Sequence, residues 1–321
     1  MTVKPVPDSL TVSARAPGKV NLHLGVGPLG DDGYHDVANL YQAVSLYETV
    51  TVTPADGFSV ELKGPFSDRE IPTDGSNLAI RAARLLADHS GIAGGVHITV
   101  TKNVPVAGGM GGGSADAAAT LVACDELWNL ELGKQELCEI GAVLGADVPF
   151  AIIGGTAIGL GRGDELTPAL GRGVYHWVIA TSKGELSTPI VYSTLDKQRS
   201  GRSVPDPTIP DGIMHALRSG DPETLAQAMH NDLQTAAMEL KPELLRALDI
   251  GEQVGALAGI VSGSGPTLAF LVSDAEQALE TALMLSASGE IDQVYRVTSP
   301  AGGARVIRPH DEHPSATRKT T

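Results

Sequence analysis

One glycine-rich run constrains this chain more than any other feature of its sequence. The segment PVAGGMGGGSA, from Pro105 to Ala115, follows an alternating strand-like segment at Val96–Thr101 and precedes an apolar pattern typical of a helix. Backbone N–H groups in such a loop can converge on an anion, and the helix N-terminus adds a positive dipole. Glycine suits this position because a Cβ would block unusual backbone angles and the close approach of a phosphate. The arrangement therefore predicts a phosphate-binding loop.

Two common nucleotide motifs do not fit this loop. A Walker A motif needs a lysine before its final Ser or Thr, and here Gly113 precedes Ser114. A dinucleotide fingerprint fits only after a shift of frame, and the β-rich sequence before the loop is not a βαβ unit. A tight loop without a ligand would be the better interpretation of an isolated glycine run. The position between strand and helix favours phosphate.

The helix after the loop is expected to begin with Ser114 as its N-cap and Asp116 in its first turn. Apolar residues then recur at helical spacing at Ala117, Leu121, Cys124 and Trp128.

The residues before the loop predict mainly strands, because short runs rich in Val, Leu and Thr are separated by Gly, Pro and Asp. These strands are expected at Leu10–Ala16, Lys19–Val26, Leu40–Leu46, Thr49–Thr53 and Phe58–Lys63. A helix is expected at Asn77–His89, a second at Lys134–Leu144 with Gly145 as its stop, and a hairpin around Gly154–Leu166.

The second half of the chain mixes helices and strands in an order that resembles a split βαβ, an α+β arrangement. Strands are expected at Val174–Thr181, Gly259–Val261, Thr267–Val272 and Gln293–Thr298. Helices are expected at Pro222–Glu239, Pro242–Val254 and Asp274–Ser286. Lys197–Pro210 is polar and proline-rich, so we expect a surface loop there.

Composition excludes several classes of protein. With 23 Lys and Arg against 38 Asp and Glu, the net charge is −15, opposite to that of a general nucleic-acid or anionic-membrane protein. An anionic ligand must therefore be held by a local device. Cys124 and Cys138 form no disulfide framework or zinc motif and are expected to be buried thiols. The N-terminal segment has no apolar signal region, so a cytoplasmic location is expected.

Three segments together resemble the motifs of the GHMP kinases, the family of galactose, homoserine, mevalonate and phosphomevalonate kinases. RAPGKVNLHLGV, Arg15 to Val26, is similar to the first motif, and PVAGGMGGGSADAA is similar to the second. GIVSGSGPTLAF, Gly259 to Phe270, is similar to the third. The motifs occur in the family order and at comparable spacing, and the resemblance covers roughly residues 10 to 300.

The resemblance implies a two-domain α+β fold. Its N-terminal domain would be like the second domain of ribosomal protein S5, and its C-terminal domain would be ferredoxin-like. We expect the N-terminal domain at residues 1–168 and the C-terminal domain at 169–300, with a disordered tail at 301–321.

Two further segments narrow the expected activity within the family. DDGYH, Asp31 to His35, and LGADVPF, Leu144 to Phe150, resemble the members that use ATP to phosphorylate the 2-hydroxyl of 4-diphosphocytidyl-2-C-methyl-D-erythritol in the non-mevalonate isoprenoid pathway. The implied cofactors are ATP and Mg²⁺, with the metal carried mainly by ATP and Ser114 as a candidate ligand. The implied partners are these small molecules, without nucleic acid or membrane, and a homodimer is compatible with the sequence.

The resemblance assigns the catalytic roles to Lys19 and Asp147. Asp147 would accept or orient the proton of the substrate hydroxyl, and Lys19 would keep it ionised and stabilise charge on the attacking oxygen. Without the resemblance, the lysine would be a surface charge and the aspartate a turn residue. The second motif would bind ATP through Pro105, Val106, Ala107, Gly108, Gly109, Met110, Gly111, Gly112, Gly113, Ser114 and Ala115.

Four residues are expected to bind the second substrate. Asn21 alternates with Lys19 on one strand, so both should share a face. The resemblance implies that Tyr34 stacks on cytosine, that His35 hydrogen-bonds it, and that Tyr192 forms a second aromatic wall where the family has Phe. A loop aromatic beside a partly buried histidine is the alternative for the first pair.

Three other positions qualify the resemblance. Asp116 places a carboxylate beside the phosphate loop, so it must either point away or help to hold magnesium. Tyr41 stands where a Phe is usual near the substrate. The turn from Ser262 to Thr267 is expected beside the active site.

Two rival functions remain to be weighed. Another small-molecule kinase of the family would have no cytosine to stack, which the DGYH segment and Tyr192 disfavour. A catalytically dead nucleotide-binding regulator is disfavoured because both Lys19 and Asp147 are present.

Overall fold

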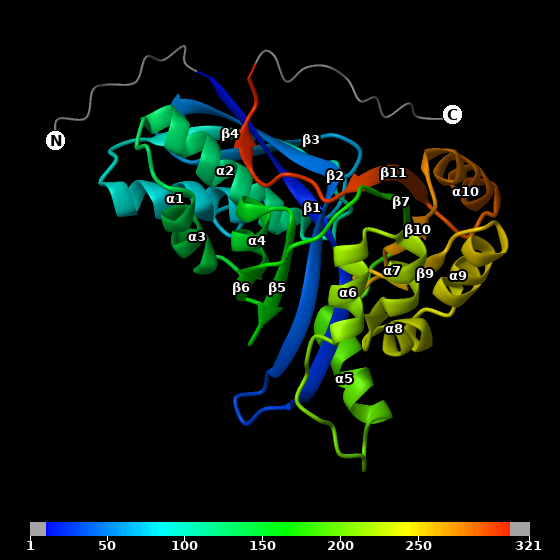
Figure 1. The fold of residues 1–321 in the computed structure, drawn as a ribbon. Helices are drawn as coiled ribbons and strands as arrows, with labels where there is room; N and C mark the ends of the chain where they lie inside the picture. The colour runs from blue at the N-terminus through cyan, green and yellow to red at the C-terminus, as the bar shows by residue number, and fades with distance from the viewer. Residues whose placement is uncertain (1–10, 309–321) are drawn as a thin grey trace.

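Two β-sheets organise the chain, one formed mainly by the first half and one by the second. The computed structural model describes residues 11–308. The first sheet has the strand order β12-β1-β2-β4-β3, with β5 and β8 branching from β2 and β1. The second sheet has the order β11-β7-β10-β9. In Figure 1 the paired strands β1 and β2 run between the two halves of the molecule.

The long hairpin of β1 (Val12–Leu29) and β2 (His35–Ala55) replaces four shorter predicted strands. Pro17 and Gly18 suggested a break, but the chain passes them through a bulge between Pro17 and Lys19 while the antiparallel pairing with β2 continues. Leu10, the first residue of the expected first strand, lies outside the described residues.

The remaining N-terminal elements follow the predicted order. They are β3 (Ser59–Lys63), α1 (Leu78–Ser90), β4 (Gly95–Thr101), α2 (Gly112–Trp128), α3 (Lys134–Ala142), α4 (Asp147–Ile153), β5 (Thr156–Leu160) and β6 (Glu165–Pro168). Helices α1 and α2 pack on each other and on the sheet around one apolar core, which contains alanines of both helices and the valines of β2 and β4. Cys124 and Cys138 are free and buried, as expected.

The start of α2 differs from the prediction. The N-cap is Gly111, with φ of 71°, and no side chain caps the helix. Only glycine takes this left-handed conformation without strain, so the chain enters the helix three residues before Ser114, which lies in the first turn. The first N–H groups of α2 are therefore not used by a side-chain cap.

The C-terminal half contains β7 (Tyr175–Thr181), α5 (Thr188–Gln198), α6 (Asp211–Ser219), α7 (Pro222–Ala228), β8 (His230–Asn231), α8 (Gln234–Leu240), α9 (Glu243–Gln253), β9 (Ala258–Val261), β10 (Leu268–Val272), α10 (Ala275–Ala287) and β11 (Gln293–Ser299). Across its antiparallel sheet the strands lie in the order β11, β7, β10 and β9. Along the chain these are the fourth, first, third and second strands of the sheet, which is the order of a ferredoxin-like sheet.

The single helix predicted at Pro222–Glu239 is wrong. The chain forms α7 and α8 and crosses between them as β8, which pairs in parallel with β1 at His23 and Leu24. The Asn231 side chain donates hydrogen bonds to Val261 O at 2.8 Å and Gly263 O at 2.7 Å. These tertiary contacts outweigh local helix propensity. The short helices α4, α5 and α6 were also not predicted.

The tail expected at 301–321 is ordered in its first part, so that expectation is wrong for residues 301–308. There β12 (Arg305–Val306) pairs with β1, and Ala304 N donates to Ala151 O at 2.8 Å. Backbone pairing with the N-terminal sheet orders this segment although its sequence lacks periodicity. Residues 309–321 lie outside the described residues.

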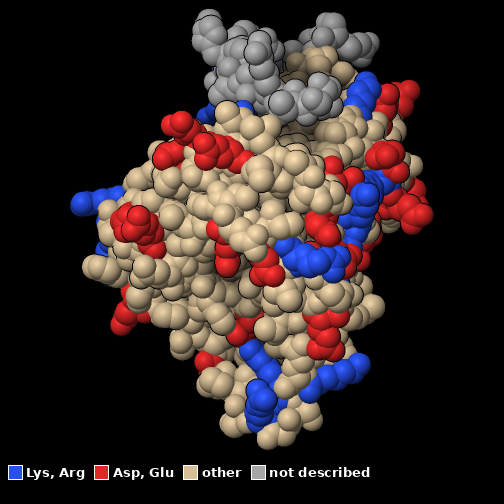
Figure 2. All heavy atoms as spheres, turned by 90° about the vertical axis from the view of Figure 1, so that its right-hand side faces the viewer, with Lys and Arg blue, Asp and Glu red and all other residues tan. Residues whose placement is uncertain are grey.

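None of the helices in residues 11–308 combines the length and apolar character needed to span a membrane. On the face formed by the C-terminal helices, Figure 2 shows acidic and basic side chains interspersed without an extended basic patch.

Candidate active site

A cleft of about 330 Å³ brings together residues from all three glycine-containing motifs. Its lining includes most of the predicted catalytic and substrate residues, together with several that the sequence did not indicate. The lining residues are Lys19, Asn21, Leu24, Val37, Asn39, Tyr41, Gly109, Gly111, Ser114, Ala146, Asp147, Arg162, Thr188, Tyr192, Leu233, Gly263 and Ser264.

Lys19 reaches this cleft from β1, immediately after the bulge. Its ammonium donates to Asn21 Oδ1 at 2.7 Å, and Asn21 Nδ2 donates to Asn39 Oδ1 at 2.8 Å. All three side chains are at least nine-tenths buried. The two β1 side chains therefore share one face, as predicted. Burial lowers the pKa of Lys19, and the charge of Asp147 opposes that shift.

Asp147 begins α4, where a carboxylate is favoured by the positive end of the helix dipole. A Cβ placed on Gly111 would lie 3.5 Å from Lys19 Cγ and 3.7 Å from Asp147 Oδ2. The two predicted catalytic side chains thus flank a glycine of the loop. Burial, and next Asp147, raise the pKa of the nearby Tyr41 hydroxyl.

The glycine loop is fixed from two sides. Lys19 N donates to Met110 O at 3.0 Å, and Ser262 Oγ donates to Gly109 O at 3.1 Å. A Cβ on Gly109 would lie 1.9 Å from Ser262 O, so only glycine fits beneath the third motif. The structure therefore places the Ser262–Thr267 turn against the loop, beside the cleft, as the resemblance implied.

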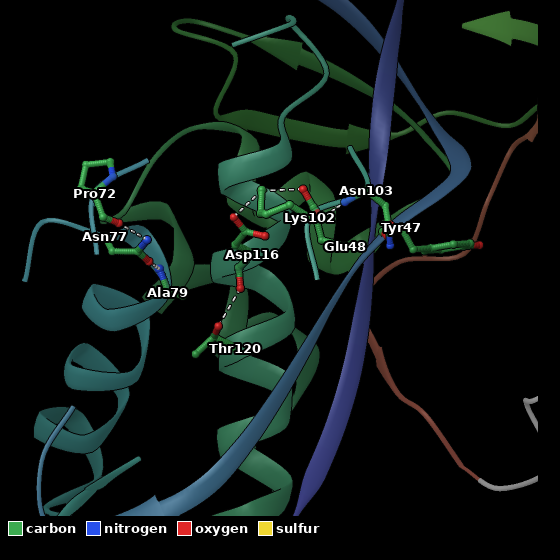
Figure 3. Close-up of polar contacts among 9 residues, drawn as sticks. All are labelled: Tyr47, Glu48, Pro72, Asn77, Ala79, Lys102, Asn103, Asp116 and Thr120. Atoms are coloured by element: carbon green, nitrogen blue, oxygen red, sulfur yellow. Dashed lines mark hydrogen bonds and ion pairs between the residues drawn. The ribbon is translucent and has the colours of Figure 1, made fainter. Parts of the chain in front are cut away.

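Beneath the loop lies a buried ion cluster, consisting of Glu48, Lys102 and Asp116 (Figure 3). Lys102 Nζ lies 2.5 Å from Glu48 Oε1 and 2.6 Å from Asp116 Oδ2. Glu48 Oε2 accepts a hydrogen bond from Asn103 N at 2.8 Å. Both ends of the loop, at Asn103 and Asp116, are therefore tied to one cluster. Asp116 points away from the cleft, which settles the alternative left open by its position in the sequence.

Both carboxyl groups of this cluster are buried, and burial raises their pKa values more than the Lys102 ammonium lowers them. Burial raises the pKa of Glu48 to about 8 and that of Asp116 to about 6. Burial lowers the pKa of Lys102, but the Asp116 and Glu48 carboxylates outweigh it and the net shift is upward. No local sequence pattern indicates this cluster, because Glu48 lies far from Lys102 and Asp116 along the chain.

Part of the cleft wall is aromatic. Tyr192, on α5, lines it, and its ring centroid lies 5.3 Å from that of His35. His35 Nδ1 lies 3.0 Å from Gly27 O, and Nε2 lies 3.4 Å from Asp196 Oδ2. Both ring nitrogens of His35 therefore have protein partners in this structure. Burial raises the pKa of Tyr192 to about 12.

Tyr34 is not a lining residue of the cleft, and it is 58% exposed. It is connected to the cleft through Arg162, whose Cζ lies 4.0 Å from the centre of the Tyr34 ring. Two lining residues, Arg162 and Asn39, were not expected from the sequence. For Arg162, the sequence signal was its position between two glycines, Gly161 and Gly163.

No group of three or more His, Cys, Asp or Glu side chains in residues 11–308 is arranged to hold a metal ion. Ser114, in the first turn of α2, is an oxygen donor that lines the cleft beside the loop. Such a donor fits an Mg²⁺ held mainly by phosphates, because that ion usually takes few protein ligands.

Comparison with known proteins assigns the family. Residues 77–155 match the GHMP kinases N terminal domain, and residues 213–305 match the GHMP kinases C terminal domain. Together they cover more than half of the chain. This chain is a GHMP kinase. The two-domain α+β fold expected from its motifs is confirmed, and kinases of this family use ATP.

Two relatives of this GHMP kinase have the same name. A protein of Leifsonia xyli is 55% identical over 303 residues, covering 92% of this chain and 98% of the relative. A protein of Clavibacter michiganensis is 56% identical, covering 92% of this chain and 96% of the relative. Both are named 4-diphosphocytidyl-2-C-methyl-D-erythritol kinase.

Solved structures agree with the family. A crystal structure of 4-(cytidine 5'-diphospho)-2C-methyl-D-erythritol kinase has a TM-score of 0.72 and 32% identity, covering 90% of this GHMP kinase and all of the other chain. An L. major mevalonate kinase has a TM-score of 0.74 at 21% identity, covering 94% of this chain and all of the other, which shows the shared fold.

Proposed function

We propose that this GHMP kinase transfers the γ-phosphoryl group of ATP to the 2-hydroxyl of 4-diphosphocytidyl-2-C-methyl-D-erythritol, in the non-mevalonate isoprenoid route. The observation that carries the proposal is a single cleft that is lined by the phosphate loop, by Lys19 and Asp147, and by Tyr192. The names of the relatives at 55% and 56% identity support this substrate.

The second motif, Pro105 to Ala115, binds the triphosphate in this proposal. Two features support that role: α2 lacks a side-chain cap, and Gly111 opens it in a left-handed conformation. Free N–H groups and the helix dipole then act on the phosphates. Ser114, in the first turn of α2, would be a protein ligand of the Mg²⁺ that ATP carries, and this ion would neutralise phosphate charge.

Asp147 and Lys19 act on the substrate hydroxyl. The hydroxyl oxygen forms a bond to the γ-phosphorus, the bond to the β-phosphate oxygen breaks, and Asp147 receives the hydroxyl proton. Lys19 stabilises the charge on the attacking oxygen, and Asn21 holds the ammonium in place. Phosphoryl transfer depends mostly on such positioning and charge neutralisation. Their position on either side of Gly111 supports these roles.

The cytidine end of the substrate binds among Tyr34, His35 and Tyr192. Stacking on aromatic side chains is worth roughly 1–3 kcal/mol for a base. The packing of His35 on Tyr192 supports this assignment, because it fixes the ring that forms one wall.

We also retain the division of the chain into an N-terminal domain at 1–168 and a C-terminal domain at 169–300, with a cytoplasmic location. The boundary follows β6 and precedes β7, the first strand of the second sheet. The cleft is lined by one chain, so the proposal does not require a homodimer and remains compatible with one.

A coupled assay of ADP release tests the function. The purified protein is given ATP and, in separate reactions, the cytidyl substrate, homoserine and mevalonate. We expect turnover with the cytidyl substrate at least tenfold more efficient than with the others. Equal or greater efficiency with homoserine or mevalonate would refute the proposed substrate.

A further inference from the structure

Arg162 is a cation of the cleft lining that has no role in the phosphoryl transfer described above. Lys19 and Arg162 are the positively charged residues in the lining of the cleft, as far as the described chain shows. Lys19 is buried beside Asp147. Arg162 lies at the turn between β5 and β6, and its side chain is 54% exposed.

The turn that carries Arg162 is fastened to β2 on both sides. Gly161 and Gly163 flank it with φ of 62° and 93°. Gly161 O accepts a hydrogen bond from Val37 N at 2.7 Å, and Gly163 O accepts one from Tyr41 Oη at 3.5 Å. A Cβ on Gly163 would lie 2.5 Å from the Tyr41 oxygen, so a larger residue would displace the turn. The backbone therefore holds Arg162 in a defined place at the cleft.

The guanidinium itself is oriented by two partners. Arg162 Nη2 donates to Asp32 Oδ2 at 2.6 Å, and Arg162 Cζ lies over the Tyr34 ring, 4.0 Å from the ring centre. Asp32 is positioned in turn, because its Oδ1 accepts a hydrogen bond from Tyr34 N at 3.0 Å. A guanidinium has five N–H donors, and the Asp32 contact uses one of them. The others remain available to a ligand with several acceptor oxygens.

We propose that Arg162 binds the diphosphate that links cytidine to the methylerythritol, and so determines specificity for a nucleoside diphosphate substrate. The inference rests on the proposed function. In that arrangement the reacting hydroxyl lies beside Lys19 and Asp147 and the base lies among Tyr34, His35 and Tyr192. The diphosphate connects these two parts of the substrate, and Arg162 lines the cleft while contacting Tyr34. Arginine matches this group because its planar fork pairs with phosphate oxygens in a bidentate way. A chain of net charge −15 needs such a local cation to hold an anion.

Arg162→Gln tests the inference, with Arg246→Gln as the matched control. Arg246, on α9, is 58% exposed and pairs with Glu290, but it is not part of the cleft lining. We expect Arg162→Gln to raise KM for the cytidyl substrate roughly 10- to 100-fold, the scale of a charge-assisted hydrogen bond. KM for ATP should stay within about twofold, because the ATP loop is not touched. Arg162→Lys, which keeps the charge without the fork, should recover part of the loss.

Arg162 could act by binding the diphosphate or only by holding the Tyr34 ring in place. Calorimetric measurement of CDP and cytidine binding distinguishes these two roles. We expect Arg162→Gln to weaken CDP binding at least tenfold and to leave cytidine binding within about twofold. An equal loss for both ligands, or unchanged CDP binding, would overturn the inference. Failure of the wild-type protein to phosphorylate the cytidyl substrate would instead refute the proposed function, so the two failures are distinguishable.

Discussion

At the scale of single residues, the proposed chemistry depends on a lysine and an aspartate that are far apart in the sequence and meet only in the folded chain. Lys19 and Asp147 were named through motif resemblance, and in the folded chain they flank Gly111 of the phosphate loop. The alternation of Lys19 with Asn21 was predictable from strand geometry. The third member of that network, Asn39, was not, because it lies on β2 and meets Asn21 only through the hairpin.

Asp147→Asn should fold normally and bind ATP with unchanged affinity, but its turnover should fall. An amide keeps the shape of the side chain but cannot accept the hydroxyl proton, and groups in this role typically contribute about 10²–10⁴-fold. Steady-state kcat and calorimetric ATP binding on the same preparation provide the check. Near-normal kcat would remove Asp147 from the mechanism.

The raised pKa of Glu48 predicts that the stability of the folded protein depends on pH. Burial raises its pKa in the fold from the ordinary 4.5 to about 8, so between these values the folded state holds a proton that the unfolded state has lost. The free energy of unfolding should therefore decrease as pH rises through this window. Glu48→Gln cannot titrate and should lack this contribution.

Urea unfolding between pH 5 and 8.5 gives the free energy of unfolding of the wild-type protein and of Glu48→Gln. The difference between these two values is followed as a function of pH. We expect the stability of the wild type to decline relative to the variant as pH increases. A difference that is constant or increases with pH would show that Glu48 is ionised in the folded protein throughout.

At the scale of secondary-structure elements, the sequence predicted those with strong local signals and missed those set by tertiary contacts. The strand–glycine loop–helix unit was recognisable because its glycines are dense and the following alanines are continuous. The interruption of the predicted helix at Pro222–Glu239 was not, because β8 exists only through pairing with β1. The same reason explains β12, whose two residues are ordered by the edge of the N-terminal sheet.

Gly111→Val should abolish nucleotide binding more than it affects folding. Valine disfavours the φ of 71° at this N-cap, and its side chain would enter the space between Lys19 and Asp147. Calorimetric titration with ATP should show at least a tenfold loss of affinity, while circular dichroism should keep the wild-type signal. Unchanged ATP affinity would mean that this loop does not cradle the triphosphate.

At the scale of the whole molecule, both halves of the chain line the cleft. The phosphate loop and Asp147 come from the N-terminal half, whereas Tyr192 comes from α5 in the C-terminal half. The third motif joins them, since Ser262 contacts the loop and Asn231 holds Gly263. The sequence predicted the family architecture through ordered motifs, but the depth and lining of the cleft depend on how the two sheets meet.

Remote binding energy from the cytidine end can orient the hydroxyl that reacts, so truncated substrates should lose rate as well as affinity. Loss of one stacked base costs roughly 1–3 kcal/mol, and a buried polar group left unpaired costs a further ~1–3 kcal/mol. The summed effect of roughly 2–6 kcal/mol corresponds to a decrease in kcat/KM of at least about 30-fold.

The most direct test of the central claim compares kcat/KM for 4-diphosphocytidyl-2-C-methyl-D-erythritol with that for methylerythritol phosphate, which lacks the cytidine monophosphate portion. Both contain the same hydroxyl, so the comparison isolates recognition of the nucleotide end. We expect the full substrate to be phosphorylated at least about 30-fold more efficiently. Equal efficiency for the two compounds would contradict both the aromatic binding site and the proposed substrate.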